Sequence, residues 1–167
     1  MVTGGGDPAL TGVYKICARR RGYAWVPTIK VSNNPEKVTN PGIKQVWRFT
    51  NTEGSPLADL IGLDDDPPAP GAAHRFHHPT GDTRSFTLKD YAGITPLLSL
   101  RMKEGRILAD SLRVQVLQAR AIAELDALDD TYKRLINPHV YRVSMSTGLR
   151  DLKARLIREN LPGGEAE

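Results

Sequence analysis

The first half of the chain alternates hydrophobic and polar positions in short runs, a pattern that predicts β-strands. Residues 12–18 and 24–31 have the composition of two hairpin strands joined by a polar turn. A second hairpin is predicted from residues 44–49 and 57–63, which flank a turn at 51–55. Four strands are therefore expected in the first part of the chain.

An acidic, proline-rich loop is predicted after these strands, and shorter apolar runs beyond it predict further strands. The loop covers residues 64–71, and the runs lie at 75–77, 85–88, 97–102 and 106–108, the last two joined by a turn at 103–105.

The spacing of hydrophobic residues changes to three and four positions from Ser111, which predicts an amphipathic helix to about residue 128. Its apolar face consists of Val114, Leu117, Ala121, Leu125 and Leu128. Asp110 or Ser111 is the expected N-cap. An alternating strand at 141–145 follows, and then a second amphipathic helix capped by Ser146 or Thr147.

These elements predict an α+β fold. We expect β-hairpins in an antiparallel or mixed sheet, followed by two C-terminal amphipathic helices that flank a strand. A length of 167 residues with 40% hydrophobic residues fits one globular domain, which we place at 13–161, with a tail at 162–167. The single cysteine, Cys17, lies in an apolar run and is expected to be a buried thiol. The sequence shows neither a secretory signal nor an apolar run of membrane length, so we expect a cytoplasmic protein without a membrane partner.

The net charge of +4 is concentrated near the N-terminus, where residues 1–50 carry a net charge of +6. The basic residues there are Lys15, Arg19, Arg20, Arg21, Lys30, Lys37, Lys44 and Arg48. This distribution suits a small polyanion as well as nucleic acid. The few aromatic residues show no interleaved stacking pattern, so we expect no nucleic-acid partner.

No complete catalytic constellation is present in the sequence, and we assign no catalytic residue. His74, His77 and His78 have neither the helical setting nor the cysteine partners of common metal sites, so we expect no metal site. The glycines at 4–6 offer backbone N–H groups that could cradle a phosphate beside Lys15 and Lys30. A plain flexible terminus is the alternative for these glycines.

Three segments together resemble the nicotinate phosphoribosyltransferase family. They are DPALTGVYK at 7–15, IKVSNNPEKVTNPGIKQVWRF at 29–49 and NPHVYRVSMS at 137–146, with GSPLADL and EGR between the last two in the family's order. The resemblance runs from about residue 2 to about residue 160 and is confined to the C-terminal third of that family. It implies a remnant of an α/β-barrel enzyme, with residues 1–12 at the end of the barrel and its phosphate loop.

In that family, nicotinate and phosphoribosyl pyrophosphate are converted to nicotinate mononucleotide with ATP and Mg²⁺, in dimers with shared sites. The resemblance implies that Thr3, Gly4, Lys15 and Lys30 contact phosphate. Surface lysines on strand edges are the alternative for the last two. None of the four histidines falls at the motif of the family's phosphorylated histidine. We therefore expect the isolated chain to be inert and to bind no cofactor tightly. The alternative is a small non-enzymatic basic domain that binds a polyanion or a protein partner.

Overall fold

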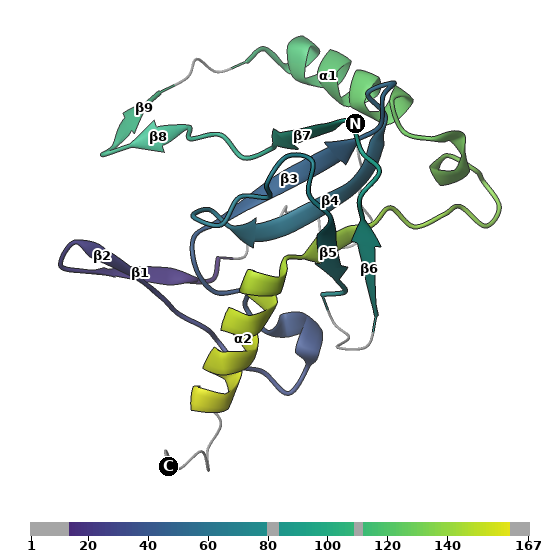
Figure 1. Cartoon of the computed structure of the whole chain (residues 1–167). Helices are drawn as coiled ribbons and strands as arrows, with labels where there is room; N and C mark the ends of the chain where they lie inside the picture. The colour runs from purple at the N-terminus through teal and green to yellow at the C-terminus, as the bar shows by residue number, and fades with distance from the viewer. Residues whose placement is uncertain (1–13, 80–83, 109–111, 161–167) are drawn as a thin grey trace, which may run out of the picture.

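The computed structural model describes residues 14–79, 84–108 and 112–160, with the exception of the side chain of Glu36. Its centre is a six-stranded sheet in the order β6-β5-β10-β4-β3-β7 (Figure 1). The strands are β3 (Lys44–Thr50), β4 (Pro56–Leu63), β5 (His74–His77), β6 (Ser85–Leu88), β7 (Gly93–Pro96) and β10 (Val143–Met145). All neighbours are antiparallel except β4 and β10, which are parallel. The mixed sheet confirms the predicted α+β class.

The hairpin formed by β3 and β4 is the predicted second hairpin. Its register pairs Trp47 with Leu60 and Arg48 with Asp59. The connecting turn is closed by Asn51, whose side-chain oxygen accepts backbone N–H groups two and four residues later, at 3.0 and 2.8 Å. This is the local bonding that makes asparagine a turn residue, so turn chemistry and strand pattern agree.

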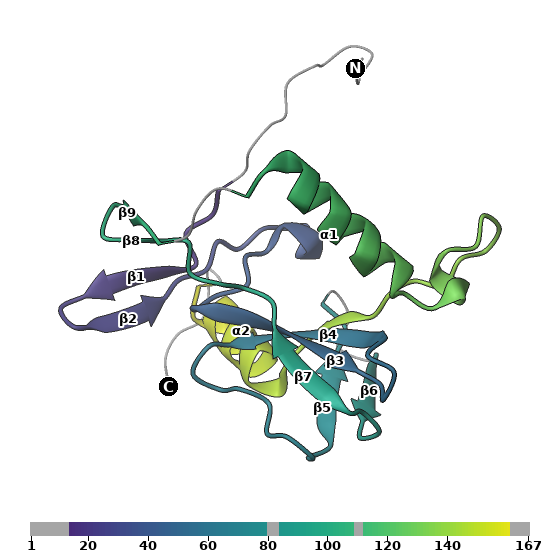
Figure 2. The ribbon, with the colours of Figure 1, turned by 90° about the horizontal axis from the view of Figure 1, so that it is seen from above.

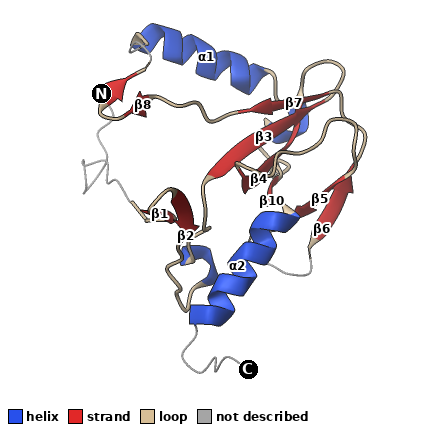
Figure 3. Cartoon of the chain, turned by 60° about the vertical axis from the view of Figure 1, so that its left-hand side comes forward, coloured by secondary structure: helices blue, strands red, loops and turns tan. Residues whose placement is uncertain are grey.

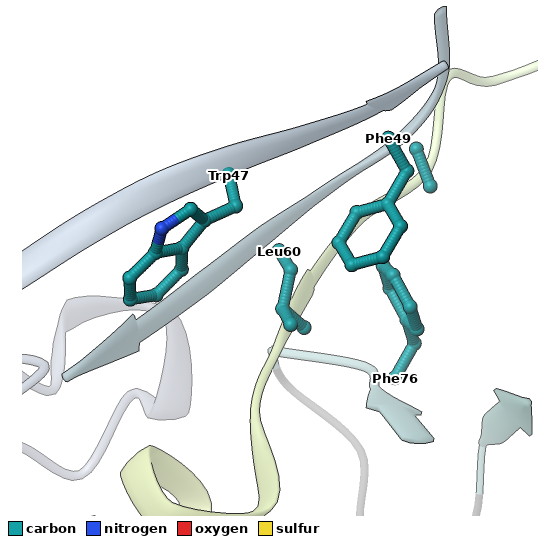
Figure 4. Close-up of a cluster of buried hydrophobic side chains, with 5 residues drawn as sticks. Trp47, Phe49, Leu60 and Phe76 are labelled. Atoms are coloured by element: carbon teal, nitrogen blue, oxygen red, sulfur yellow. The ribbon is translucent and has the colours of Figure 1, made fainter. Parts of the chain in front are cut away.

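The hydrophobic core lies on one face of this hairpin. Trp47 and Phe49 alternate with more exposed neighbours along β3 and pack with Leu60 of β4 and Phe76 of β5 (Figure 4). The rings of Phe49 and Phe76 meet edge to face with centroids 5.2 Å apart. Both rings are fully buried, and the edge-to-face contact stabilises the fold in addition to the hydrophobic burial.

Helix α2 (Thr147–Asn160) packs against β4 and β5 and buries Leu149 completely. Its first turn is capped by Ser146, whose Oγ accepts the backbone N–H of Leu149 at 3.2 Å. The predicted cap and helix are therefore confirmed. Because β10 ends at Met145, directly before this cap, the helix starts from the interior of the sheet.

The first predicted hairpin is shorter than expected. Strands β1 (Ala18–Arg21) and β2 (Ala24–Pro27) pair around Gly22, so the predictions of strands at 12–18 and 24–31 were wrong in their bounds. Pro27 has no N–H to continue the ladder, and the regular pairing ends with it. Beyond Pro27 the segments stay together through single contacts, among them Thr28 N–H to the carbonyl of Cys17 at 2.8 Å.

The strand predicted at 97–102 is also wrong. Strand β7 ends at Pro96, after which Leu98 pairs with the side chain of Gln45 in place of a backbone ladder, through bonds of 2.8 and 3.0 Å. A small separate hairpin of β8 (Met102–Lys103) and β9 (Arg106–Ile107) follows, and its turn at Glu104 and Gly105 has positive φ at both residues.

Helix α1 (Val114–Asp126) confirms the prediction of an amphipathic helix, although none of its residues is buried. It begins after Arg113 without a side-chain cap. The expected caps, Asp110 and Ser111, lie outside the described residues. Figure 2 shows α1 beside the sheet, and Figures 1 and 3 place α1 and α2 on opposite sides of it.

Two short 3-10 turns complete the described chain, η1 (Pro35–Lys37) and η2 (Asp130–Tyr132). No described helix is long and apolar enough to cross a membrane.

Candidate phosphate-binding groove

A hollow of about 710 Å³ lies beside the first hairpin and contains four basic residues. We call it the hairpin groove and define it by Lys15, Arg19, Lys30 and Lys37. Hydroxyl-bearing side chains complete its polar lining, namely those of Tyr14, Thr28 and Ser32. The structure thus brings Lys15 and Lys30, which the sequence singled out, to one site, and adds Arg19 and Lys37.

Two hydrogen bonds connect the segments that carry Lys15 and Lys30 to the turn that contains η1. The Nζ of Lys15 donates to the carbonyl of Lys37 at 2.8 Å, which fixes the end of that side chain over η1. The carbonyl of Lys30 accepts the N–H of Thr39 at 3.2 Å. The turn that contains η1 is therefore tied to both segments, and the groove is formed within residues 14–37.

The four cations of the hairpin groove make no ion pair with a carboxylate among the described side chains. Positive groups gathered without counter-charges raise the local potential and attract anions. Lysines and an arginine supply several charge-assisted donors to a phosphate. The described lining of the groove is therefore suited to binding a phosphate group.

The glycine-rich part of the predicted phosphate site, Thr3 and Gly4, lies outside the described residues. Arg19 and Lys37 were not predicted as ligands. Both belong to the group of eight basic residues in positions 1–50, which the sequence does show. Only the fold determines which of these eight line the same groove.

The histidines are engaged in the fold. Nε2 of His74 lies 2.8 Å from the carbonyl of Ala69 and 3.3 Å from the hydroxyl of Tyr91. His77 is bonded through Nε2 to Thr147 at 3.0 Å and through Nδ1 to Arg150 at 3.1 Å. No group of three or more potential metal ligands occurs among the described residues.

The pKa of His77 is lowered from its usual range, first by burial and then by the charges of Arg150 and Arg75, which the carboxylate of Asp151 partly offsets. Because arginine only donates, Nδ1 of His77 accepts and Nε2 carries the proton in the neutral ring. Folding therefore favours neutral His77.

This ring gives the chain a pH dependence. The unfolded histidine titrates near pH 6.5, so below that pH the unfolded chain binds a proton that the folded chain resists. We expect the free energy of unfolding, measured by urea denaturation, to fall as the pH is lowered from 7.5 to 5.5. His77→Gln should flatten this dependence, whereas His139→Gln on the exposed surface should leave it unchanged. An equal slope in the wild type and in His77→Gln would contradict the assignment.

A second polar cluster joins the C-terminal segment to the sheet. Arg48 donates two hydrogen bonds to Asp59, from Nε to Oδ1 at 2.9 Å and from a terminal nitrogen to Oδ2 at 3.0 Å. The hydroxyl of Tyr141 donates to the same Oδ1 at 2.9 Å. The carboxylate raises the pKa of Arg48, and burial raises that of Tyr141, so both keep their protons at neutral pH. This cluster is structural, because its donors and acceptors are directed at one another.

Comparison with known proteins gives a consistent picture. A family model described as nicotinate phosphoribosyltransferase C-terminal domain matches residues 43–153. The nicotinate phosphoribosyltransferase of Bacillus subtilis is 32% identical over 161 residues, which cover 95% of this chain and 32% of the relative. The human enzyme is 31% identical over 156 residues, 93% of this chain and 28% of the relative.

A crystal structure of human nicotinic acid phosphoribosyltransferase is similar with a TM-score of 0.61 and 28% identity, and the match covers 71% of this chain and 24% of that one. The chain thus spans a third or less of the length of these relatives. The first hairpin precedes the residues matched by the family model. The match to the C-terminal domain of the family therefore does not include the hairpin groove.

Proposed function

The chain belongs to the nicotinate phosphoribosyltransferase family, and we propose that it forms the C-terminal portion of such an enzyme. The complete enzyme would make nicotinate mononucleotide from nicotinate and phosphoribosyl pyrophosphate with ATP, as a cytoplasmic step of NAD salvage. The observation that carries the proposal is the hairpin groove, in which Lys15 and Lys30 line one hollow together with Arg19 and Lys37.

In this proposal the hairpin groove is one wall of a phosphate site. Its cations bind and orient phosphate or pyrophosphate, and their charge offsets the negative charge on the phosphate oxygens. The described lining fits phosphate groups of ATP or phosphoribosyl pyrophosphate. No carboxylate is among the described lining residues, so we assign no Mg²⁺ ligand to the groove.

Removal of one groove lysine tests this role. A charge-assisted hydrogen bond contributes about 1.5 kcal/mol or more, so Lys15→Gln and Lys30→Gln should each weaken the binding of pyrophosphate by about tenfold. Isothermal titration at low salt measures this change. The exposed Lys103→Gln carries the same loss of charge outside the groove and should bind as the wild type does. Full retention of affinity in both groove variants would refute the phosphate role of these lysines.

We expect the isolated chain to be catalytically inert. We place the phosphorylated histidine in the part of the enzyme that this chain does not span. The rings of His74 and His77 are hydrogen-bonded within the fold. When nicotinate, phosphoribosyl pyrophosphate, ATP and Mg²⁺ are mixed with the chain, chromatography should detect no more nicotinate mononucleotide than in the protein-free mixture. Product above that level, in proportion to the amount of chain, would show that it is complete as a catalyst.

The apolar surface supports a larger assembly. Along α1, Val114, Leu117 and Leu125 are 73%, 47% and 55% exposed, and Ile107 of β9 is 72% exposed. Large exposed apolar patches mark interfaces. We propose that the remaining part of the enzyme and a second subunit cover these faces, as in a homodimer with shared sites.

A non-enzymatic domain that binds a polyanion is the second candidate, and the same cluster of four cations in the hairpin groove favours it. Filter binding separates the two proposals. If RNA is retained on the filter with the chain and pyrophosphate does not displace it, the non-enzymatic domain is favoured. If the chain binds pyrophosphate but not RNA, the portion of a phosphoribosyltransferase is favoured.

A further inference from the structure

A second basic hollow lies between α2 and the turn that contains η1, two elements that stand side by side in Figures 1 and 3. We call it the α2 groove and define it by Arg150, Lys153 and Arg158. Its volume is about 400 Å³, within the range of small-molecule sites. The hairpin groove and the α2 groove share the turn at 35–38 as a wall, but no residue lines both.

Helical spacing puts the three cations on one face. Arg150 lies three positions before Lys153 and eight before Arg158, spacings that place it on the same side of the helix as each of them, and Lys153 and Arg158 flank it on either side. The apolar residues between them, Ala154 and Ile157, lie on the same face and line the same groove. One side of α2 therefore presents a positive rim and an apolar surface together.

Lys153 carries the strongest argument for a ligand. Its side chain is half-buried, and its Nζ donates to the side-chain oxygen of Asn40 at 2.9 Å. No described carboxylate forms an ion pair with it, and burial lowers its pKa. A desolvated cation without a counter-charge destabilises the fold. An anion in the groove would supply the missing charge.

Arg150 lines the groove, and its guanidinium is fixed by bonds to two neighbouring side chains. Its Nε and one terminal nitrogen donate to Asp151 at 2.9 and 2.7 Å, and its other terminal nitrogen donates to His77 at 3.1 Å. These bonds use three of the five N–H donors of a guanidinium, and the others can reach a ligand. A donor that is fixed in advance loses little side-chain entropy when the ligand binds.

The remaining lining indicates what the anion is attached to. Val38, Met145 and Ile157 give the groove an apolar wall, which inorganic phosphate alone would leave uncovered. Met145 is only 4% exposed, so this wall is continuous with the core of the sheet. Ligand sites of this kind combine an apolar surface for a ring with a few polar groups that fix its orientation.

We propose that the α2 groove binds an organic phosphate of nucleotide size, with a phosphate or pyrophosphate group on Arg150, Lys153 and Arg158 and a ring against Val38, Met145 and Ile157. The proposed role of the site is to bind this ligand, and His78 also lines the groove. This inference goes beyond the proposed function and uses none of the hairpin groove's lysines.

Isothermal titration with ADP, inorganic pyrophosphate and adenosine tests the proposal, in the full chain that carries Lys15→Gln and Lys30→Gln, so that pyrophosphate binding at the hairpin groove is weakened in every comparison. We expect ADP to bind at least tenfold more tightly than either pyrophosphate or adenosine, because only ADP engages both the cations and the apolar wall. Lys153→Met should weaken ADP binding by about tenfold or more, as expected for one lost charge-assisted contact of about 1.5 kcal/mol. Arg158→Gln, at an exposed position, should weaken it severalfold.

Arg155→Gln is the matched control. Arg155 lies on the same helix, is paired with Glu159 and does not line the groove, so its loss should leave the ADP affinity within twofold. Because Lys15→Gln and Lys30→Gln are present in every titration, the result separates this site from the hairpin groove. No ADP binding by the chain with these two substitutions alone, unchanged affinity in Lys153→Met, or equal affinity for ADP and pyrophosphate would each overturn the proposal. Circular dichroism of every variant verifies the fold.

Discussion

Asp59→Asn should destabilise the chain by about 3 kcal/mol, because it leaves the partly buried guanidinium of Arg48 without its partner. Asp59 is 6% exposed and accepts from both Arg48 and Tyr141. Asparagine keeps the volume but removes the negative charge, so the guanidinium of Arg48 loses its partner. Urea denaturation at pH 7 measures the free energy of unfolding, and Tyr141→Phe should cost only about 1–2 kcal/mol, because one hydrogen bond is lost.

Glu124→Gln is the matched control for this prediction. Glu124 forms an ion pair with Arg120 one turn away on α1, but both side chains are about half exposed, at 48% and 57%. Exposed pairs of this kind contribute about 0.3–0.5 kcal/mol. If Asp59→Asn cost no more than Glu124→Gln, the cluster around Asp59 would not fasten the segment at 137–142 to the sheet.

Phe49→Ala should cost about 3–5 kcal/mol, because it empties the centre of the core. Phe49 is fully buried, and its ring contacts those of Phe76 and Tyr91 edge to face, with centroids 5.2 and 4.9 Å apart. The surrounding strands β3, β4 and β5 belong to one hydrogen-bonded sheet, in which β10 lies between β4 and β5, so they can close only part of the cavity. We expect a large drop in the urea midpoint with a similar dependence on denaturant concentration.

Tyr23→Ala provides the comparison for Phe49→Ala. Tyr23 is 99% exposed at the tip of the first hairpin, so its removal should change the free energy of unfolding by less than about 0.5 kcal/mol. A loss of the same size at both positions would mean that the core does not centre on Phe49.

Local patterns explain which predictions the structure confirmed. The second hairpin, the turn closed by Asn51 and the start of α2 at Ser146 all rest on contacts within about five residues or on strict alternation. The strand predicted at 97–102 failed because the side chain of Gln45, 53 positions before Leu98, takes the backbone bonds that a ladder would need. The β-propensity of residues 97–102 contains no information about a side chain that bonds to their backbone from so far away in the sequence.

The candidate sites show the same division. The excess of positive charge in residues 1–50 and the likeness to the family could be read from the sequence, and both directed attention to Lys15 and Lys30. The α2 groove could not be read in this way, because its apolar wall comes from the turn at 35–38 and from β10, more than a hundred residues apart. Only the placement of η1 beside α2 brings these parts together.

By itself, then, the sequence determined the class of fold, the strands and helices with strong local patterns, and the family. The tertiary structure decided that β10 lies parallel to β4 and pairs with β5 on its other side, which of the many cations share a groove, and which of them form an ion pair with a described carboxylate. The physical reason is one of range. Hydrophobic period and turn chemistry act over a few residues, whereas strand order and charge compensation depend on contacts between segments that meet only after folding.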